Sequence, residues 1–436
     1  MRSHSCPRLR NENGQLTDSA EGRSWFGRLT GKERRTFWAC FGGWAADAAD
    51  VQIFSLLIPV LLSTGFLRTN SQAGAIGTVT LLCSAVGGWV AGVLADRYGR
   101  VRVLKITIVW FSVFTLLCGL AQDPGQLGVL RALMGFGFGG EWAIGAVLMA
   151  ETVRPEFRGR AVGTVQSGWA IGWAAAVMLF VGVSRIFPPE WTWRVLFGLG
   201  LLPALVVIHV RRHVTEPEIH RASPRAPLKD SLRIFGPGLI GRTVSCSLLA
   251  IGAQGGYYAL TTWLPQFLAQ ERGLKVYGLG ATLALIIAGA FTGYLLGAWA
   301  ADALGRRVTL MLAAAAAFVT VIPFVLLNTS VLVFTLLCFP LGLFSSAYFS
   351  AIGPLFSEQF PTEVRTTGLA FAYNFGRGTG AVFPLAVGVV ADRIGIATSI
   401  AIFAGIAYAL LGVCAFFIRE RPGAALDTIA VEGTRR

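Results

Sequence analysis

Twelve long apolar segments constrain the fold of this chain more than any other feature of its sequence. Each has the length of about 20 mainly apolar residues that an α-helix needs to cross a bilayer. Of the 436 residues, 54% are hydrophobic and only 14% are charged, whereas about 25% are charged in a soluble globular protein. The sequence therefore predicts an all-α membrane protein. The segments lie near 37–63, 72–95, 103–121, 126–150, 161–183, 192–210, 239–268, 278–300, 308–327, 330–356, 366–391 and 396–418.

A polar stretch divides these segments into two groups of six. It is the longest polar stretch between apolar segments and contains several arginines, prolines and acidic residues. We interpret it as a linker between two helical bundles. The predicted domains are an N-terminal tail at 1–35, a six-helix bundle at 36–212, the linker at 213–238, a second six-helix bundle at 239–418 and a C-terminal tail at 419–436.

The basic residues predict how the chain crosses the membrane. With the N-terminus inside, 29 of the 37 Lys and Arg fall on the inner side, 6 fall in outer loops, and Arg131 and Arg377 fall within spans. Inner loops of membrane proteins carry the excess of Lys and Arg. We therefore expect an integral protein of a bacterial-type inner (plasma) membrane, with both termini in the cytoplasm and a monomeric state.

An internal repeat relates the two halves. The stretch GVLADRYGRVRVL at 92–104 returns as GAWAADALGRRVTL at 297–310, and Asp96 and Asp302 lie 206 residues apart. A second landmark, Glu151, has its counterpart at Glu358, 207 residues later. Parallel repeats of six spans are an arrangement of secondary transporters, with the substrate site near the midplane between the halves.

The motifs at these positions resemble those of the major facilitator superfamily. The first loop matches the family's Gly-x-x-x-Asp-Arg-x-Gly-Arg pattern through Gly92, Asp96, Arg97, Gly99 and Arg100. The second copy keeps Asp302, Gly305 and Arg306 but has Ala303 in place of the first arginine. The fourth span resembles the family's glycine-rich motif through Arg131, Gly135, Gly137 and Gly139. The resemblance implies the major facilitator fold, with twelve transmembrane helices in two pseudo-symmetric bundles and alternating access.

A narrower resemblance concerns the cargo. Asp47-Ala-Ala-Asp50 is similar to the first-helix Asp-Gly-x-Asp motif of aromatic acid/proton symporters, with Ala48 where that family has glycine. The stretches GEWAIGAVLMAE (140–151) and YNFGRGTGA (373–381) resemble sialate- and metabolite-type proton symporters. This implies a small carboxylate substrate that moves together with protons.

Three acidic residues within spans are candidate proton-coupling groups. A charge at the centre of a membrane helix costs about 2.5–3.5 kcal/mol on insertion scales, so it pairs, faces a cavity or becomes neutral. Asp47 and Asp50 are three residues apart and share a helix face, so repulsion favours a proton on one of them. Glu141 is the third candidate. The pair can instead hydrogen-bond neighbouring helices or bind Arg131, and Glu141 can pair with an arginine.

Arg377 is the candidate substrate anchor because it lies near the midplane of a span that is otherwise free of charge. A guanidinium offers a planar set of donors suited to a carboxylate. The alternative is a fixed ion pair between Arg377 and Asp47 or Asp50. For Arg131 we expect either a coupling ion pair with the first span or snorkelling to the outer surface. The other predicted cavity residues are Asn374, Tyr373, Gln254, Tyr257, Tyr258, Gln166, Trp169 and Tyr348.

The charged loops on the inner side predict a cytoplasmic gate. Acidic residues favour the N-termini of helices, and arginines of neighbouring loops lie within reach of them. An ion-pair latch there would hold one access state. Its predicted residues are Asp96, Arg97, Gly99, Arg100, Arg160, Asp302, Arg306 and Arg365.

These observations together predict a proton-coupled symporter for a small organic carboxylate, with no cofactor and no metal, the proton being the coupling ion. Residues 135–140 contain Gly-x-Gly-x-x-Gly, but they lie inside a span, which excludes the nucleotide-binding interpretation of that pattern. The expected partners are the organic anion, protons and the bilayer, and no nucleic acid. The alternatives are a sugar or polyol porter or a drug/proton antiporter of the same fold, or a membrane enzyme or receptor, for which neither a nucleophile–base set nor a sensor domain is visible.

Overall fold

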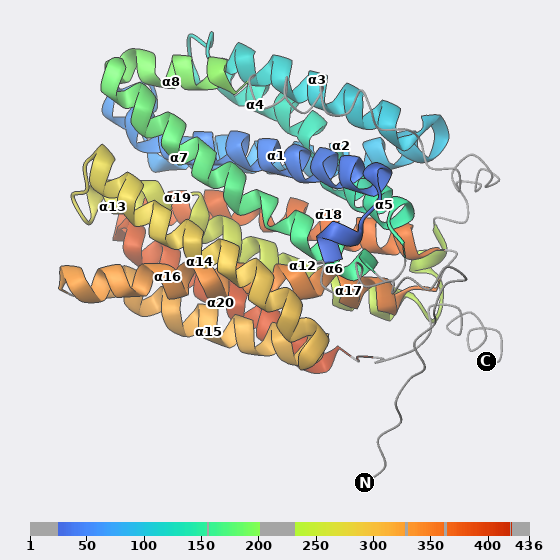
Figure 1. The fold of residues 1–436 in the computed structure, drawn as a ribbon. Helices are drawn as coiled ribbons and strands as arrows, with labels where there is room; N and C mark the ends of the chain where they lie inside the picture. Colours follow the sequence, from blue (N-terminus) through green and yellow to red (C-terminus); the bar gives the residue numbers. More distant parts are fainter. Residues whose placement is uncertain are drawn as a thin grey trace, which may run out of the picture.

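A computed structural model describes residues 25–154, 157–200, 232–327, 330–361, 364–418 and residue 420. The described part is helical, and its helices run roughly parallel to one long direction (Figure 1). In an environment without water the backbone must satisfy its own hydrogen bonds, and a helix does so within one segment. The predicted linker at 213–238 lies largely outside the described residues.

The N-terminal half forms one layer of Figure 1, drawn in blue to green. Its elements are η1 (Trp25–Arg28), α1 (Gly31–Ser63), α2 (Asn70–Tyr98), α3 (Arg100–Cys118), α4 (Pro124–Phe138), α5 (Gly140–Thr152), α6 (Arg158–Gln166), α7 (Gly168–Ile186) and α8 (Pro189–Leu199). We call the end of the molecule where α1 begins the near end, on the right in Figure 1, and the opposite end the far end.

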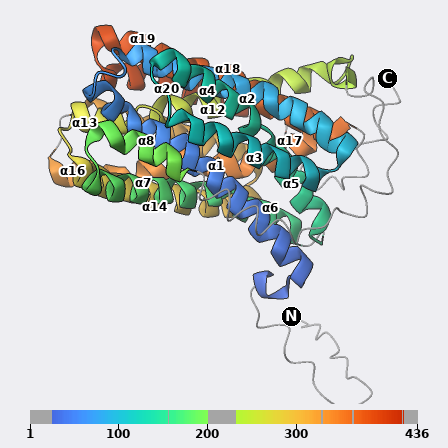
Figure 2. The same ribbon diagram turned by 90° about the horizontal axis from the view of Figure 1, so that it is seen from above.

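The C-terminal half forms the second layer, drawn in yellow to red (Figures 1 and 2). Its elements are η3 (Leu232–Phe235), α12 (Ile240–Thr261), α13 (Leu264–Gln270), α14 (Val276–Ala303), α15 (Arg306–Leu326), α16 (Val331–Ala347), α17 (Phe349–Gln359), α18 (Arg365–Gly380), α19 (Val382–Ile394) and α20 (Ile396–Phe417).

Five of the spans that we predicted as continuous helices are bent, because a short turn divides each of them. The turns separate α4 from α5, α6 from α7, α12 from α13, α16 from α17 and α18 from α19. The turn residues Gly139 and Ala381 keep helical dihedral angles (φ −61° and −63°), so these helices bend without reversing. In the described part of the chain, eight helices have the length and apolar character to cross a membrane. The predicted fourth, sixth, seventh and eleventh spans are absent from that set. The fourth span consists of two shorter helices, α4 with Arg131 and α5 with Glu141, and the eleventh consists of α18, with Arg377, and α19.

Glycines hold two equivalent helix pairs together, which supports the predicted repeat. A Cβ on Gly135 of α4 would lie 2.2 Å from the carbonyl oxygen of Thr80 in α2. A Cβ on Gly342 of α16 would lie 1.8 Å from that of Ile286 in α14. Gly135 and Gly342 are 207 residues apart, close to the offset of the sequence repeat. Small residues at these crossings let the two backbones approach closely, as they do in membrane helices.

Candidate functional site

A small cavity between the two halves is the candidate site. Its volume is about 20 Å³, which is room for about one water molecule. Residues of α1, α6 and α7 line it from the N-terminal half, and residues of α12, α14, α17 and α18 line it from the C-terminal half. The lining residues are Trp44, Gln166, Trp169, Gln254, Tyr257, Tyr258, Tyr294, Phe349, Tyr373 and Arg377.

Arg377 brings a positive charge to this cavity. Its side chain is 1% exposed, and its guanidinium carbon lies 5.1 Å from the ring centre of Phe138 and 5.3 Å from that of Tyr373. Within the described residues it has no carboxylate partner, and its Nε has no hydrogen-bond partner. The ion pair with Asp47 or Asp50 that we considered is therefore not formed. Cation–π contacts return about 0.5–2 kcal/mol each, so the buried cation keeps a strong preference for an anion.

The local sequence NFGRGTG explains why an arginine fits at this depth. Gly376 and Gly380 of α18 let the helix approach α12 closely: a Cβ would lie 2.3 Å from Ala250 at the first position and 3.0 Å from the backbone nitrogen of Gly255 at the second. Arg377 sits between these two contacts, one turn before the bend at Ala381. The close packing of α18 on α12 directs the guanidinium toward Tyr258, with which it interacts.

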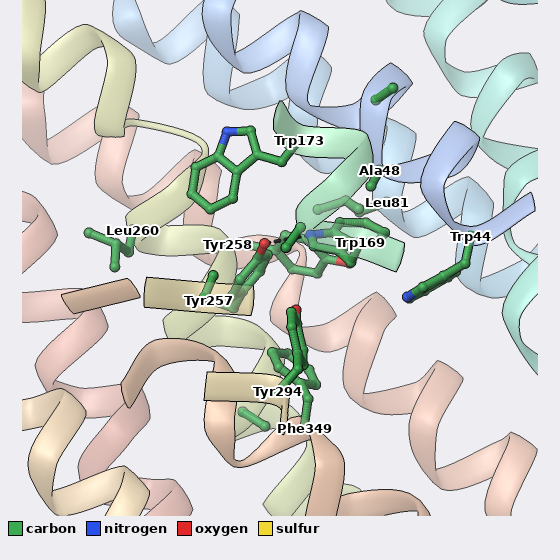
Figure 3. Packing of buried hydrophobic residues seen from close by; sticks show 14 of the residues in the cluster. Trp44, Ala48, Leu81, Trp169, Trp173, Tyr257, Tyr258, Leu260, Tyr294 and Phe349 are labelled. Carbon is green, nitrogen blue, oxygen red and sulfur yellow. Dashed lines mark hydrogen bonds between the residues drawn. The ribbon is translucent and has the colours of Figure 1, made fainter. Parts of the chain in front are cut away.

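Aromatic side chains of the two halves meet at the cavity, and Figure 3 shows Trp169 beside Tyr257 and Tyr258. The Trp169 indole Nε1–H donates to the Tyr257 hydroxyl oxygen at 2.5 Å. This hydrogen bond joins α7 to α12 and thereby links the halves. The Gln254 side-chain amide donates to the backbone carbonyl of Tyr373 at 2.9 Å. The cavity therefore combines flat apolar walls with a few fixed polar groups, the general composition of small-molecule sites.

A second cavity of about 20 Å³ lies beside the first and shares Trp44 and Gln166 with it. It is also lined by Cys40, Glu141, Trp142, Gly145, Met149 and Val165. The Trp142 ring stacks on Tyr373, with ring centres 3.9 Å apart and an interplanar angle of 17°. Its indole nitrogen donates to Gln166 Oε1 at 3.0 Å. Trp142 thus forms part of the partition between the two cavities.

Asp50 and Arg131 form an ion pair inside the N-terminal bundle. Arg131 Nη1 lies 3.1 Å from Asp50 Oδ2, and both side chains are buried. The Thr115 hydroxyl of α3 donates to Asp50 Oδ1 at 2.7 Å. Phe54 covers the guanidinium at 4.8 Å. Arg131 is therefore buried and does not snorkel to the surface. Neither residue lines the central cavity, and of the alternatives considered for the aspartates, Asp50 adopts the ion pair with Arg131.

The two other candidate proton groups are also buried but lie in different places. Asp47 is fully buried and does not line either of the two cavities. Glu141 is 2% exposed and lines the second cavity, next to Trp142. The carboxylate of Asp50 is directed toward α3 and α4, where Thr115 and Arg131 contact it.

The structure places seven of the nine predicted substrate-binding residues around the central cavity. Tyr348 is not among them, because its hydroxyl donates to the Ala253 carbonyl at 3.1 Å and its ring packs on Tyr408. Asn374 is not among them either, because its amide donates back to the Ala370 carbonyl at 3.1 Å. Trp44, Tyr294, Phe349 and Trp142 were not predicted from the sequence, because a ring that lines a cavity has the same local sequence pattern as one that packs between helices.

At the near end, charged residues of the C-terminal half contact the turn after α14. Arg306 Nε lies 3.2 Å from Glu358 Oε1 in α17, and Arg306 Nη2 lies 3.9 Å from Asp302 Oδ1. Glu420 accepts the Arg306 backbone N–H at 2.7 Å. Gly99 and Gly305 have φ of 99° and 93° at equivalent turns, a conformation that favours glycine. The side chains of Asp96, Arg97, Arg160 and Arg365 lie outside the described part. The cytoplasmic latch, including the role of Arg100 in it, therefore stays a prediction.

At the far end, Asp392 ties the C-terminal half to the start of α2. Its Oδ1 accepts the backbone N–H and the side-chain N–H of Asn70 at 3.2 and 3.0 Å, and its Oδ2 accepts the Ser71 backbone N–H at 3.2 Å as well as the Ser71 hydroxyl. Burial raises the pKa of this carboxyl, but these hydrogen bonds outweigh it and hold the pKa below its ordinary value. Close by, a Cβ on Gly74 of α2 would lie 2.8 Å from the Pro384 carbonyl oxygen. The halves are therefore in tight contact on this side of the cavity.

Comparisons with known proteins identify a family and several similar transport proteins. The sequence profile of the Major Facilitator Superfamily matches residues 36–377 and 276–434. The chain is 40% identical to a "Probable 4-methylmuconolactone transporter" of Cupriavidus pinatubonensis, over 93% of this chain and 95% of that protein. It is 32% identical to the cis,cis-muconate transport protein of Acinetobacter baylyi, over 86% and 92% of the two chains.

Among solved structures, the fold resembles that of the xylose transporter XylE from E. coli in a partially occluded, inward-open conformation. The TM-score is 0.69 at 16% sequence identity, and the match covers 91% of this chain and 100% of that one. At this identity the likeness concerns the fold.

Proposed function

The chain is a member of the major facilitator superfamily, a transporter and not an enzyme, and from this premise we propose that it takes up a small organic carboxylate together with protons by alternating access. The observation that carries the proposal is Arg377: a buried cation at the central cavity that has no carboxylate partner among the described residues. A guanidinium in such a site binds a carboxylate through charge-assisted hydrogen bonds, which are roughly twice as strong as neutral ones. The names of the relatives, which refer to muconate and methylmuconolactone, support an organic acid as the substrate.

We assign the proton-coupling step to the buried acids of the N-terminal half. Protonation of Asp50 would remove the charge that holds Arg131, and the freed guanidinium would then favour a rearrangement of α1 against α4. Glu141 is the second candidate because it lines the cavity next to the central one. Asp47, buried on the same helix as Asp50, is the third. No bound cofactor is needed in this scheme, since the proton is the coupling ion.

Basic residues on the near side support the orientation that we propose. The near end would face the cytoplasm, since it carries the start of α1 and most of the Lys and Arg among the described residues. The far end, where Asp392 caps α2, would then face the outside of a bacterial-type inner membrane. In that orientation the contacts of α2 with α19 close the outer entrance, and the chain would act as a monomer.

Uptake into proteoliposomes tests the proposal. The purified full-length protein is reconstituted, and entry of labelled benzoate, cis,cis-muconate and D-xylose is measured with and without an inward proton gradient. We expect the carboxylates to accumulate only with the gradient and xylose not to enter. Carboxylate entry that ignores the gradient would contradict proton coupling, and uptake of xylose alone would support the sugar porter instead.

A further inference from the structure

The central cavity is too small for the proposed class of substrate, so part of its wall must move. Its volume of about 20 Å³ holds about one water molecule, and a small organic acid is several times larger. Close-packed interiors yield most easily where a side chain can rotate without displacing backbone. The wall that moves is therefore best sought among side chains that are not fully enclosed.

Trp142 meets that condition. The aromatic residues that line the central cavity are buried, whereas Trp142, which covers Tyr373, is only partly buried. It stands at the start of α5, directly after the bend at Gly139 and Gly140. Its polar contact is the hydrogen bond to Gln166. Rotation of this one ring would join the two cavities, because both already reach Trp44 and Gln166.

Tyr373 is the surface that Trp142 covers. The two rings are nearly parallel, 3.9 Å between centres, so Trp142 occupies the place of a flat π system on Tyr373. Arg377 is one helical turn further along α18, with its guanidinium carbon 5.3 Å from the same ring. If a flat ligand stacks on Tyr373, the Arg377 guanidinium is therefore near enough to bind the carboxylate of that ligand.

We propose that the planar, conjugated part of the substrate replaces Trp142 on Tyr373 while its carboxylate binds Arg377, so that the site selects flat conjugated carboxylates over saturated ones of the same size and charge. This inference rests on the proposed function and names the substrate class within it. Trp142 is a lid that competes with the substrate for Tyr373, and Tyr373 is the specificity-determining residue. A stacked aromatic pair contributes about 0.5–1.5 kcal/mol beyond its buried area, which corresponds to a preference of about two- to tenfold.

Matched ligand pairs separate flatness from charge and size. Cis,cis-muconate and adipate are both six-carbon dicarboxylates, and benzoate and cyclohexanecarboxylate are both six-membered-ring monocarboxylates. The dissociation constants of the four acids are measured by calorimetry on the purified full-length protein. We expect the conjugated member of each pair to bind about two- to tenfold more tightly. Equal binding within both pairs would overturn the inference and leave the proposed function standing, whereas binding of none of them would count against the proposed function itself.

Variants test the two roles separately. Tyr373→Leu should bring the ratio within each pair close to one, while Tyr373→Phe, which keeps the ring, should preserve it. Trp142→Leu removes the competing ring, so both members of a pair should bind more tightly at an unchanged ratio. Trp89→Leu, at a position 66% exposed on the outer surface, is the matched control for loss of a tryptophan.

The ratio is the readout because a displaced Arg377 would weaken both members of a pair alike. A ratio that survives in Tyr373→Leu, or that disappears in Trp142→Leu, would overturn the proposal. If Tyr373→Leu does not fold, Tyr373→Met supplies the same comparison with an unbranched side chain.

Discussion

The two halves of the molecule bury their central arginines in opposite ways. In the N-terminal half, Arg131 is neutralised by Asp50 at 3.1 Å and lies away from the central cavity. In the C-terminal half, Arg377 lines the cavity and has aromatic faces as neighbours but no carboxylate among the described residues. Both side chains are almost fully buried, so burial alone does not distinguish them.

The comparison separates a structural charge from one held ready for a ligand. A buried ion pair costs stability when either partner is lost, because the other charge stays behind uncompensated. A buried cation without a partner costs stability while it is present and returns that energy when an anion binds. Substitution of Arg377 should therefore lower substrate affinity without lowering stability, whereas substitution of Asp50 should lower stability.

The largest effect is expected from Arg377→Met. Hydrogen bonds to a charged group are worth about 1.5–3 kcal/mol, so substrate affinity should fall by roughly ten- to 150-fold. The empty protein should melt at the same or a higher temperature, because an uncompensated charge is removed. Arg377→Lys keeps the charge but lacks the planar set of donors, so its substrate affinity should lie between that of the wild type and that of Arg377→Met. Wild-type affinity in Arg377→Met, measured by the same calorimetry, would remove the anchor from the mechanism.

Asp50→Asn should have the opposite effect on stability. It leaves Arg131 buried opposite a neutral amide, which costs roughly 3–5 kcal/mol of stability for a broken buried pair, and the melting temperature in detergent should fall. The double variant Asp50→Leu with Arg131→Met restores an apolar contact and should recover most of that loss. If the pair couples protons, the double variant should bind the carboxylate but no longer accumulate it in response to the gradient. A gradient response that persists would assign coupling to Glu141 or Asp47.

A smaller effect is expected where the halves meet at the far end. Asp392→Ala removes the acceptor that caps α2 across the interface. A carboxylate at a helix N-terminus is worth about 0.3–1 kcal/mol, so opening on this side should increase about two- to fivefold. The readout is the labelling rate of Thr78→Cys, in a cysteine-depleted background, by a membrane-impermeant thiol reagent. Thr78 is a buried residue of α2 whose hydroxyl donates to the Ala381 carbonyl at 2.6 Å, between the two halves. Asp123→Ala, which removes a cap within the N-terminal half alone, should leave this rate unchanged.

The sign of the pKa shift makes the same contact insensitive to ordinary pH changes. The folded-state pKa of Asp392 lies below the ordinary value of 3.8, so its contribution is complete above that pH and is lost only as the pH falls through the lowered pKa. Because the thiolate is the reactive form of a cysteine, the labelling rate of the Thr78→Cys protein is divided by that of an exposed cysteine at the same pH. This relative rate should be constant between pH 5 and 8, and a rise in it within that range would show that another group controls the far end.

Much of the candidate site could be predicted from the sequence because charge inside an apolar span is conspicuous. Asp50, Arg131 and Arg377 stand out by their cost in hydrocarbon, and the aromatics near them follow from their depth in the spans. Trp142 and Phe349 could not be found in this way. Each follows a bend, at Gly139 and Tyr348 respectively, and the direction in which a side chain points beyond a bend depends on packing that a regular helical period does not describe.

The sequence by itself determined the membrane-spanning helices, the 206-residue repeat and the identity of the buried charges, because hydropathy and composition act along the chain. Only the tertiary structure decided which acid faces which arginine. Asp50 is held by Arg131 and Thr115 from two other helices, and Arg377 is left to the cavity because the glycines of α18 bring it against α12. Those pairings depend on how helices far apart in the chain cross and bend, and so they follow from packing in three dimensions.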